Sequence, residues 1–477
     1  MRLAFPLSAI LCFGYAFFAS IKVWPPLDGD APAYFSPAVE FSQGRGLVNQ
    51  VWLPPLDDSI DGPGGRRYVY HGLIYPLLIG CLGRLSGGGA TACVAWMHIF
   101  NALVALVASW GVLGFCRWGG LWRGLLAFVC PLAWFALCEG VVGRPEPAVF
   151  LWLGMGLISV QKAPGFCPFL LPFFAGLTFF SSPAMGVLAF VLLVAFRLTQ
   201  NTEFGFQELA LGLTGALAAA GICFLFYPYP AADWFMGVWR HSRINLGLPQ
   251  GQGFFPTWIA RAQTPVLLLT LAVPFVLALW SLVRIVPNLS PIRRIMFCPL
   301  GFVFLLGIAK VAFFKTEASY NAVVWIPVAV AMGVGFSQVW LARMIFLVSL
   351  CLPVLGLARN AFILGHQFTQ EAVSFREVRE VITKKIEEGV EVSPGFFLAT
   401  PDPRLISFAG GQSTNGLPPL WRIEQQTYRG IQNPPNLPQY QLVENRFGRG
   451  VMILGVPISR TPGGWEYAIY KKKEVSH

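Results

Sequence analysis

Stretches of about twenty consecutive apolar residues recur along most of this chain, starting with residues 3–24. A helix of that length crosses a hydrocarbon core of about 30 Å, because each residue adds about 1.5 Å along the helix axis. Only 12% of the residues are charged, whereas ordinary soluble domains have about 25%. The pattern predicts an α-helical polytopic membrane protein in contact with a lipid bilayer.

The basic residues between the apolar stretches predict which side of the membrane each loop faces. Lys and Arg collect in cytoplasmic loops, so the first helix, at about 4–24, runs outward from a cytoplasmic N-terminus. These loops and a basic tail facing anionic lipid explain the formal charge of +11; the chain has no nucleic-acid module, and we expect no nucleic-acid partner. We expect about eleven transmembrane helices in residues 1–363. After the first, they lie at about 90–115, 121–140, 147–160, 166–196 (two short spans broken near Ser181-Ser182-Pro183), 209–227, 263–284, 295–314, 320–340 and 344–363.

Two regions outside the expected spans have a composition of their own. Residues 25–88 form the first external loop, where Tyr34, Ala38 and Phe41 recur at helical spacing and predict a helix lying in the membrane interface. Residues 71–85 are apolar but short and broken by proline, so we expect them to dip into the interface as well. From residue 364 the chain turns polar, with an amphipathic helix at 375–388 and strand-like runs at 395–400, 450–455 and 465–470. Residues 364–477 therefore predict a small soluble α/β domain on the extracytoplasmic side.

Two carboxylates follow directly after the first apolar stretch, in the sequence Asp28-Gly29-Asp30-Ala31-Pro32-Ala33-Tyr34. Pro25 and Pro26 end the helix before them, since proline lacks an amide hydrogen and clashes with the preceding turn. Ionisable groups held at the margin of a membrane are costly and are therefore candidates for function. A structural role is also open, because Asp30 fits the N-cap of a helix that has Pro32 in its first turn, and Asp28 fits a solvated turn.

Further polar groups lie in segments that we expect outside the membrane. His71 and Tyr75 occur in His71-Gly72-Leu73-Ile74-Tyr75-Pro76, and Arg144 and Glu146 occur in Gly143-Arg144-Pro145-Glu146 at the start of a helix. Glu146 also matches the positive end of that helix's dipole, which is a structural role. Cations on the same side suit a phosphate group, and they suit lipid headgroups equally well. These cations are Arg240, Arg243 and Lys315.

In their order along the chain, these motifs resemble the GT-C glycosyltransferases, over roughly residues 1–363. The likeness is to the branch that contains protein O-mannosyltransferases and lipid A aminoarabinose transferases. The family's catalytic Asp is often part of Asp-Glu-x-x-Tyr; Asp30 and Tyr34 match this spacing, whereas Ala31 replaces the second acid. The segment from His71 to Pro76 is similar to the family's His-Pro-Pro-Leu-Tyr-Pro, with Gly72-Leu73 in place of the two prolines, and 143–146 resembles an Arg-Pro-Glu/Asp turn at an external helix start.

The resemblance implies an enzyme that transfers a sugar from a polyprenyl-phosphate donor to a lipid-linked glycan, lipid or protein acceptor. The reaction is expected on the extracytoplasmic side, with inversion at the anomeric carbon and an Asp as general base. Asp30 takes the catalytic position, and Glu146 is a second acid or positions the acceptor. The expected substrate-binding residues are Asp28, Tyr34, His71, Tyr75, Arg144, Arg240, Arg243, Lys315 and Tyr320. We expect an integral, multi-pass protein of a bacterial inner membrane.

Nothing in the sequence requires a metal or a cofactor. Asp57, Asp58 and Asp61 carry the oxygen ligands that Ca²⁺ or Mg²⁺ prefers, but they lie in a Pro- and Gly-rich loop where solvated acids are ordinary. A divalent cation therefore stays an alternative. The main alternative function is a transporter or flippase of a lipid-linked sugar. A non-catalytic GT-C-like scaffold is a third, because Ala31 stands where relatives have an acid.

Overall fold

The computed structural model describes the N-terminal half of the chain most fully. The described residues are 3–22, 32–48, 68, 71–115, 118–140, 142–183, 186 and 206–247, parts of 340–358, and short segments between 398 and 472. The chain divides into two compact units. The first contains Met1–Ser20, Val69–Ile79 and Ala95–Leu357; the second contains Ile21–Tyr68, Gly80–Val94 and Ala358–His477. The boundary between the units falls within the helices at 4–22, 74–85 and 89–115, and each unit is described by itself.

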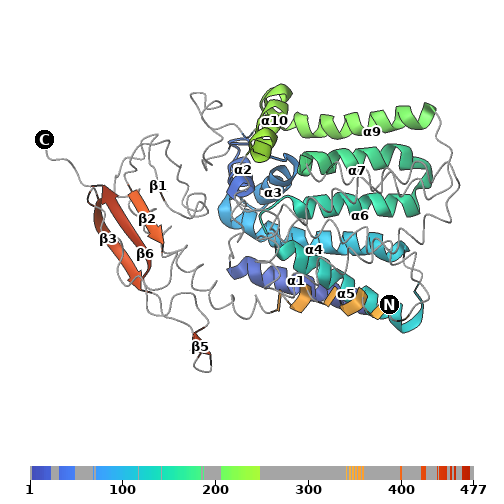
Figure 1. The fold of residues 1–477 in the computed structure, drawn as a ribbon, viewed down its shortest axis with the longest axis horizontal. Coiled ribbons are helices and arrows are strands. Elements are labelled where there is room, and N and C mark those ends of the chain that lie inside the picture. Colours follow the sequence, from blue (N-terminus) through green and yellow to red (C-terminus); the bar gives the residue numbers. More distant parts are fainter. Residues whose placement is uncertain are drawn as a thin grey trace. The chain divides into compact units, whose positions relative to one another are not determined.

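Helices make up most of the described residues (Figure 1). They are α1 (Ala4–Lys22), α2 (Pro32–Ser42), α3 (Ile74–Leu85), α4 (Gly89–Phe115), α5 (Gly120–Glu139), α6 (Glu146–Lys162), a 3₁₀ turn η1 (Pro164–Phe166), α7 (Cys167–Ser181), α9 (Phe206–Leu225) and α10 (Ala231–Gly247). Five stretches of the described part are long and apolar enough to cross a membrane: Ala4–Ile21, Gly89–Gly114, Gly120–Glu139, Pro164–Ser181 and Phe206–Leu225. The predicted class, a helical membrane protein, is confirmed at this level. The spans expected at 263–284, 295–314 and 320–340 lie outside the described residues.

Short connections make the consecutive helices of the first unit antiparallel neighbours. α5 and α6 are joined by residues 140–145, and α6 and α7 by the turn η1. α6 packs on α7, and α7 packs on α9, so these helices lie side by side in Figure 1. The alternation brings the end of α5 and the start of α6 to one end of the helices. The start of α5 and the end of α6 lie at the opposite end.

Small residues allow close approach between helices of the first unit. A Cβ added to Gly154 of α6 would lie 2.9 Å from the Cα atom of Ala108 in α4, and one added to Gly111 would lie 2.9 Å from the Gly154 carbonyl oxygen. In lipid, where apolar burial gives helices little reason to associate, such backbone contact is a main source of attraction. Gln161 adds a polar link, since its Nε2 donates to the Gly111 carbonyl at 2.7 Å.

α7 ends where the sequence predicts a break. Ser182 is extended (φ −153°, ψ 106°), directly after the last helical residue, Ser181. The Ser181 hydroxyl donates to the carbonyl of Leu177 at 2.8 Å and accepts from Trp152 Nε1 of α6 at 3.1 Å. The break near Ser181-Ser182-Pro183 is therefore confirmed, whereas most of the second short span expected after it lies outside the described residues.

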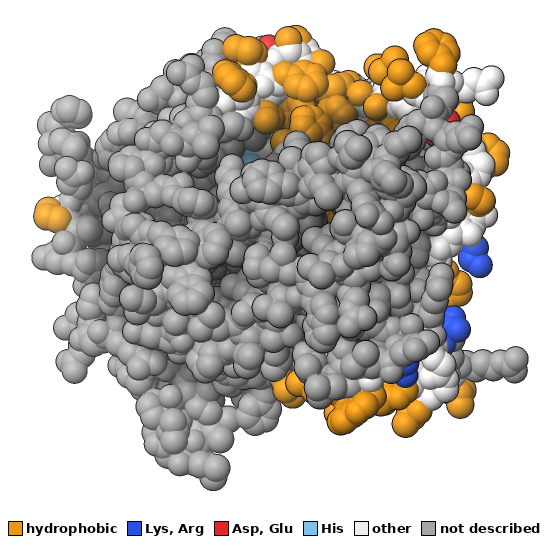
Figure 2. Space-filling view, turned by 45° about the vertical axis from the view of Figure 1, so that its right-hand side comes forward, with side chains coloured by type: hydrophobic (Ala, Val, Ile, Leu, Met, Phe, Trp, Pro, Cys, Tyr) orange, Lys and Arg blue, Asp and Glu red, His pale blue; other side chains and the backbone are white. Residues whose placement is uncertain are grey.

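Three described cations lie at the end of the first unit opposite the α5–α6 connection. Arg123 lies in the first turns of α5 and Lys162 in the last turn of α6. The guanidinium of Arg343 lies over the rings of Trp118 (5.7 Å) and Trp122 (6.0 Å), which places it at the same end. Figure 2 shows Lys and Arg side chains gathered on the right, where α4 and α6 end in Figure 1. This clustering agrees with the cytoplasmic loops predicted from the sequence, and the side of the membrane stays a prediction.

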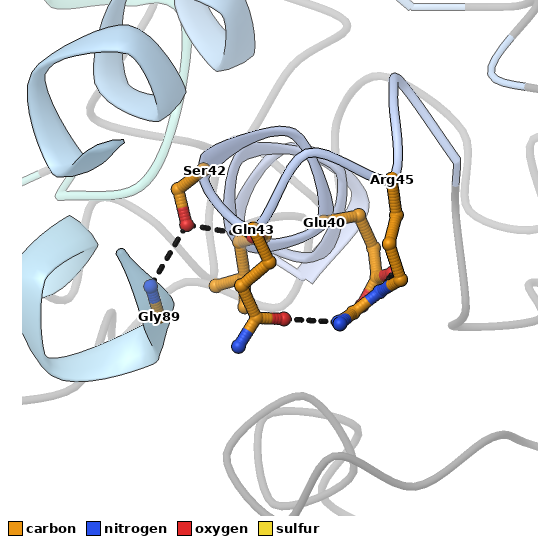
Figure 3. Close-up of polar contacts among 6 residues, drawn as sticks. Glu40, Ser42, Gln43, Arg45 and Gly89 are labelled. Carbon is orange, nitrogen blue, oxygen red and sulfur yellow. Dashed lines mark hydrogen bonds and ion pairs between the residues drawn. The ribbon is translucent and has the colours of Figure 1, made fainter. Parts of the chain in front are cut away.

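In the second unit, α2 is held by contacts with the segment that starts α4. Ser42 Oγ accepts a hydrogen bond from the Gly89 amide at 2.9 Å and donates to the Val39 carbonyl at 2.7 Å (Figure 3). The carboxylate of Glu40 pairs with the guanidinium of Arg45, which also contacts Gln43. All side chains from Tyr34 to Glu40 are buried. The helix predicted around Tyr34 is present, and both its faces are covered by protein from Tyr34 to Glu40. Its place at the membrane interface stays a prediction.

The described part of residues 364–477 consists of strands. A four-stranded sheet has the order β1 (Leu398–Ala399), β2 (Trp421–Gln425), β6 (Trp465–Lys472) and β3 (Tyr440–Phe447). β1 pairs with β2 in parallel, and the other pairs are antiparallel. β4 (Met452–Ile453) and β5 (Val456–Pro457) form a separate hairpin. Strands were expected at β1, β4 and β6; the helix expected at 375–388 lies outside the described residues.

Candidate functional site

Buried polar side chains of α4, α5 and α6 gather at the end of the first unit where α5 stops and α6 begins. Two groups can be distinguished. One is centred on Glu139, the last residue of α5, and the other on Glu146, the first residue of α6. We call the two together the polar cluster; its members are His98, Asn101, Glu139, Arg144 and Glu146. Ionisable groups buried at membrane depth are expensive, which makes this cluster the leading candidate site.

Glu139 is bound by two side chains of α4. His98 Nδ1 lies 2.8 Å from Glu139 Oε2, and Asn101 Nδ2 donates to Glu139 Oε1 at 3.0 Å. Asn101 Nδ2 also donates to the carbonyl of Cys138 at 3.2 Å, which is one of the last carbonyls of α5 without a partner inside the helix. All three side chains are almost fully buried, with exposed fractions of 2%, 0% and 6% for His98, Asn101 and Glu139. The contacts fix the C-terminal end of α5 against α4.

Glu146 is paired with Arg144 inside the turn that starts α6. Arg144 Nε lies 3.2 Å and 3.3 Å from the two carboxylate oxygens, and Nη2 lies 3.1 Å from Oε1. Both residues are 2% exposed. Gly143 has a positive φ of 86°, a conformation that L side chains rarely adopt, so a glycine is needed for the chain to make this turn. Glu146 also lies at the N-terminal end of α6, where the helix dipole favours a negative charge.

Tyr75 links the two groups. It lies in the first turn of α3 and is fully buried, with its ring 6.1 Å from that of Phe100 in α4. Burial raises the pKa of its phenol well above the usual value of 10; a backbone hydrogen bond with Gly143 opposes the shift, and the carboxylates of Glu139 and Glu146 add to it. The phenol is therefore neutral near both carboxylates. Tyr75 and Glu146, two residues singled out in separate sequence motifs, are therefore close enough to interact electrostatically.

His71 is held by α10, across 163 positions of the chain. Its carbonyl oxygen accepts a hydrogen bond from Trp234 Nε1 at 2.8 Å. A Cβ added to the next residue, Gly72, would lie 1.7 Å from the carbonyl oxygen of Ser181, so only glycine fits between the segment before α3 and the end of α7.

The other predicted site residues are Asp28, Asp30, Tyr34, Arg240, Arg243, Lys315 and Tyr320. Asp28, Asp30, Lys315 and Tyr320 lie outside the described residues, as do Asp57, Asp58 and Asp61. Arg240 and Arg243 lie in α10, with only their backbone described. Tyr34 is buried in α2 of the second unit. In the part of the chain that the structure describes, no group of three or more His, Cys, Asp or Glu residues could hold a metal ion.

His98, Asn101 and Glu139 were not predicted from the sequence. The sequence does contain a signal for them. His98 and Asn101 are three positions apart within a long apolar stretch, and Glu139 ends the next apolar stretch. Polar groups three apart lie on one face of a helix. The rule that makes Asp30 a candidate, the cost of ionisable groups near a membrane, applies to these residues as well.

The arrangement pairs each buried carboxylate with a nitrogen partner. Glu146 has the permanent charge of Arg144, while Glu139 has His98, which can carry or release a proton. Chemically, the cluster can hold a proton between His98 and Glu139, and it can keep the Arg144–Glu146 turn in one position. No protein-family model, curated protein or solved structure matches this chain, so these functions rest on the sequence motifs and the geometry alone.

Proposed function

We propose that this chain is a membrane glycosyltransferase of the GT-C type. It would transfer a sugar from a polyprenyl-phosphate donor to a lipid-linked glycan, lipid or protein acceptor on the extracytoplasmic side. The observation that carries the proposal is that Tyr75, of the first motif, lies close enough to Gly143 and Glu146, of the second, for both to influence the pKa of its phenol. Two of the motifs on which the family resemblance depends, distant in sequence, are neighbours at one end of the first unit.

The proposed reaction is a single displacement at the anomeric carbon. The carboxylate of Asp30 accepts the proton of an acceptor hydroxyl while its oxygen attacks, and the bond from the anomeric carbon to the phosphate oxygen breaks with inversion. A positioned general base contributes typically about 10²–10⁴-fold to the rate. The polyprenyl phosphate that leaves gains negative charge on its oxygen, which cationic donors stabilise. Arg240, Arg243 and Lys315 are the proposed donors, with Tyr320 beside the donor.

Arg144 and Glu146 are proposed to act as a positioned pair in this reaction. Arginine has five N–H donors, so contacts with Glu146 leave the guanidinium able to make further contacts in the same plane. Because Glu146 is 2% exposed and faces Arg144, we assign it to positioning the turn and the acceptor, with Asp30 as the base. His71 and Tyr75 would line the donor side of the same region.

The test is sugar transfer by the purified full-length protein from a panel of labelled polyprenyl-phosphate sugars. We expect transfer from at least one donor, and a loss of about 10²–10⁴-fold in the Asp30→Asn variant. Glu208→Gln is the matched control, because this acid lies in the first turn of α9, at the end of that helix away from α10, and should transfer normally. Unchanged transfer by Asp30→Asn would remove Asp30 from the mechanism.

A transporter of a lipid-linked sugar is the second candidate, and the pair formed by His98 and Glu139 favours it. Both residues belong to candidate membrane spans and are buried, and His and acidic residues inside membranes often form proton pathways. Vesicles containing the protein distinguish the candidates. Movement of an intact labelled lipid-linked sugar across the bilayer, lost in Glu139→Gln and without sugar transfer, would support the transporter.

A further inference from the structure

α10 has one face that belongs to the protein core. Trp234 is fully buried, and its ring contacts those of Phe180 at 5.2 Å, Phe179 at 6.0 Å and Phe224 at 6.1 Å. Gly237, three residues further along the helix, is also buried. Since residues three apart share a helix face, this face is fixed against α7 and α9.

The opposite face of α10 is apolar and exposed. Met236 and Trp239 have exposed fractions of 52% and 62%, and Phe235, which is 48% exposed, lies at the edge of this face with its ring 5.8 Å from that of Phe224. Arg240 follows Met236 by four residues and Arg243 follows Trp239 by four, which is the spacing that brings helix positions onto the same face. Large aromatic and apolar side chains followed by arginines are typical of helices that lie in a membrane interface.

The position of α10 in the chain indicates the same environment. It follows α9, a candidate span whose exposed side chains are apolar, including Leu213, Leu217 and Leu225. The connection contains Pro228 and Pro230, which prevent the helix from continuing outward. Figure 1 shows α10 at the end of α9 and turned across its direction, and in Figure 2 hydrophobic side chains gather at the top, the height at which α9 and α10 lie in Figure 1.

We propose that α10 is an interfacial helix that binds the headgroup region of anionic phospholipids. Trp239, Met236 and Phe235 would enter the boundary between headgroups and acyl chains, where aromatic side chains concentrate. Arg240 and Arg243 would contact lipid phosphates, the phosphate of the proposed polyprenyl donor among them, and a negatively charged leaflet attracts them more than a neutral one. The proposal depends neither on sugar transfer nor on transport.

The two faces of α10 connect this lipid contact to the candidate site. Trp234 donates to the His71 carbonyl, and His71 lies three residues before the first helical residue of α3, which also contains Tyr75. An interfacial α10 would therefore fix the depth of the His71 segment relative to the lipid surface. The depth that α10 sets would explain why the indole nitrogen of Trp234 is used for a hydrogen bond to the His71 carbonyl on the buried face of this helix.

Photocrosslinking of the full-length protein in nanodiscs tests the proposal. p-Benzoylphenylalanine replaces Trp239, and the nanodiscs contain equal amounts of phosphatidylglycerol and phosphatidylcholine. We expect lipid adducts by mass spectrometry, with phosphatidylglycerol several-fold in excess. The same probe at Leu217 in α9 is the matched control and should give lipid adducts without this excess. Adducts to protein, either to the same chain or to a second copy, or no adduct at all, would overturn the interfacial assignment.

The charge requirement is tested in the same nanodiscs. The double variant Arg240→Gln and Arg243→Gln, with the probe at position 239, should lose the phosphatidylglycerol excess and keep its lipid adducts. The double variant Arg240→Lys and Arg243→Lys should keep most of the excess and serves as a control for folding. An excess that persists without either arginine, or one that equals the excess at Leu217, would refute anionic lipid binding by this helix.

Discussion

The pair formed by His98 and Glu139 offers the sharpest test of the polar cluster. The side chains are 2.8 Å apart and each is 3% exposed. In His98→Leu, Glu139 has to stay buried with Asn101 as its side-chain donor or take up a proton, and either is costly. Breaking a buried pair in this way costs about 3–5 kcal/mol.

The assay is reversible unfolding of the purified protein in mixed micelles, followed by tryptophan fluorescence. We expect His98→Leu and Glu139→Leu each to lower the free energy of unfolding by several kcal/mol. Replacing both partners by apolar residues is often neutral or stabilising, so the double variant should cost at least about 1 kcal/mol less than the sum of the two.

A matched control comes from the same helix. Ser109 of α4 is fully buried, and its hydroxyl has no hydrogen-bond partner within the described structure. Ser109→Ala should be neutral or stabilising, because it removes a buried polar atom without breaking a bond. The argument for a buried pair is refuted if His98→Leu and Glu139→Leu each cost less than about 1 kcal/mol, as the loss of an exposed ion pair does. It is also refuted if the cost of the double variant equals the sum of the two single costs.

Three further substitutions test the packing. Gly154→Leu should strongly lower the thermal stability, because α4 leaves no space for a side chain. Gly221→Ala, with nothing within 4 Å of the added Cβ, should instead stabilise the protein by about 0.5–1 kcal/mol. Equal effects of the two substitutions would contradict the close approach of α4 and α6. Ser42→Ala should raise the hydrogen-exchange rate of the Gly89 amide, since that amide loses its acceptor, and an unchanged rate would show that the bond is not formed in solution. Trp234→Phe should cost about 0.5–1.5 kcal/mol by removing the hydrogen bond to the part-buried His71 carbonyl, and a neutral result would mean that water replaces the indole.

The helices were predictable because the apolar stretches determine them almost alone. The span expected at 121–140 is Gly120–Glu139 in the structure, and the span expected at 209–227 is Phe206–Leu225. In a bilayer every backbone polar group has to be satisfied within the segment, so length and hydropathy specify a helix without knowledge of its neighbours.

The burial of α2 was not predictable in the same way. The recurrence of Tyr34, Ala38 and Phe41 predicts one apolar face, but Ser36 and Glu40 are buried too. Whether a polar residue is covered depends on what other segments place around it, and the contact from Ser42 to Gly89 joins positions 47 apart in sequence. A single-sequence pattern contains no such information.

The Glu139 group of the polar cluster and two of the strands were missed for different reasons. His98 and Glu139 lie inside expected spans, where one polar residue hardly alters the apolar pattern. The strands β2 and β3 contain charged residues such as Arg422 and Glu444, so neither stands out as an apolar run. Both pair with β6, and that pairing, which depends on distant parts of the chain, makes them strands.

Sugar transfer in sealed vesicles tests the central claim most directly. The full-length protein is reconstituted with a labelled polyprenyl-phosphate sugar and an acceptor lipid, and the anomeric configuration of any product is determined. The proposed enzyme predicts a glycosylated acceptor of inverted configuration, which Asp30→Asn does not form. Donor that crosses the bilayer intact, with no product from any sugar of the panel, would contradict the transferase and leave the transporter in its place.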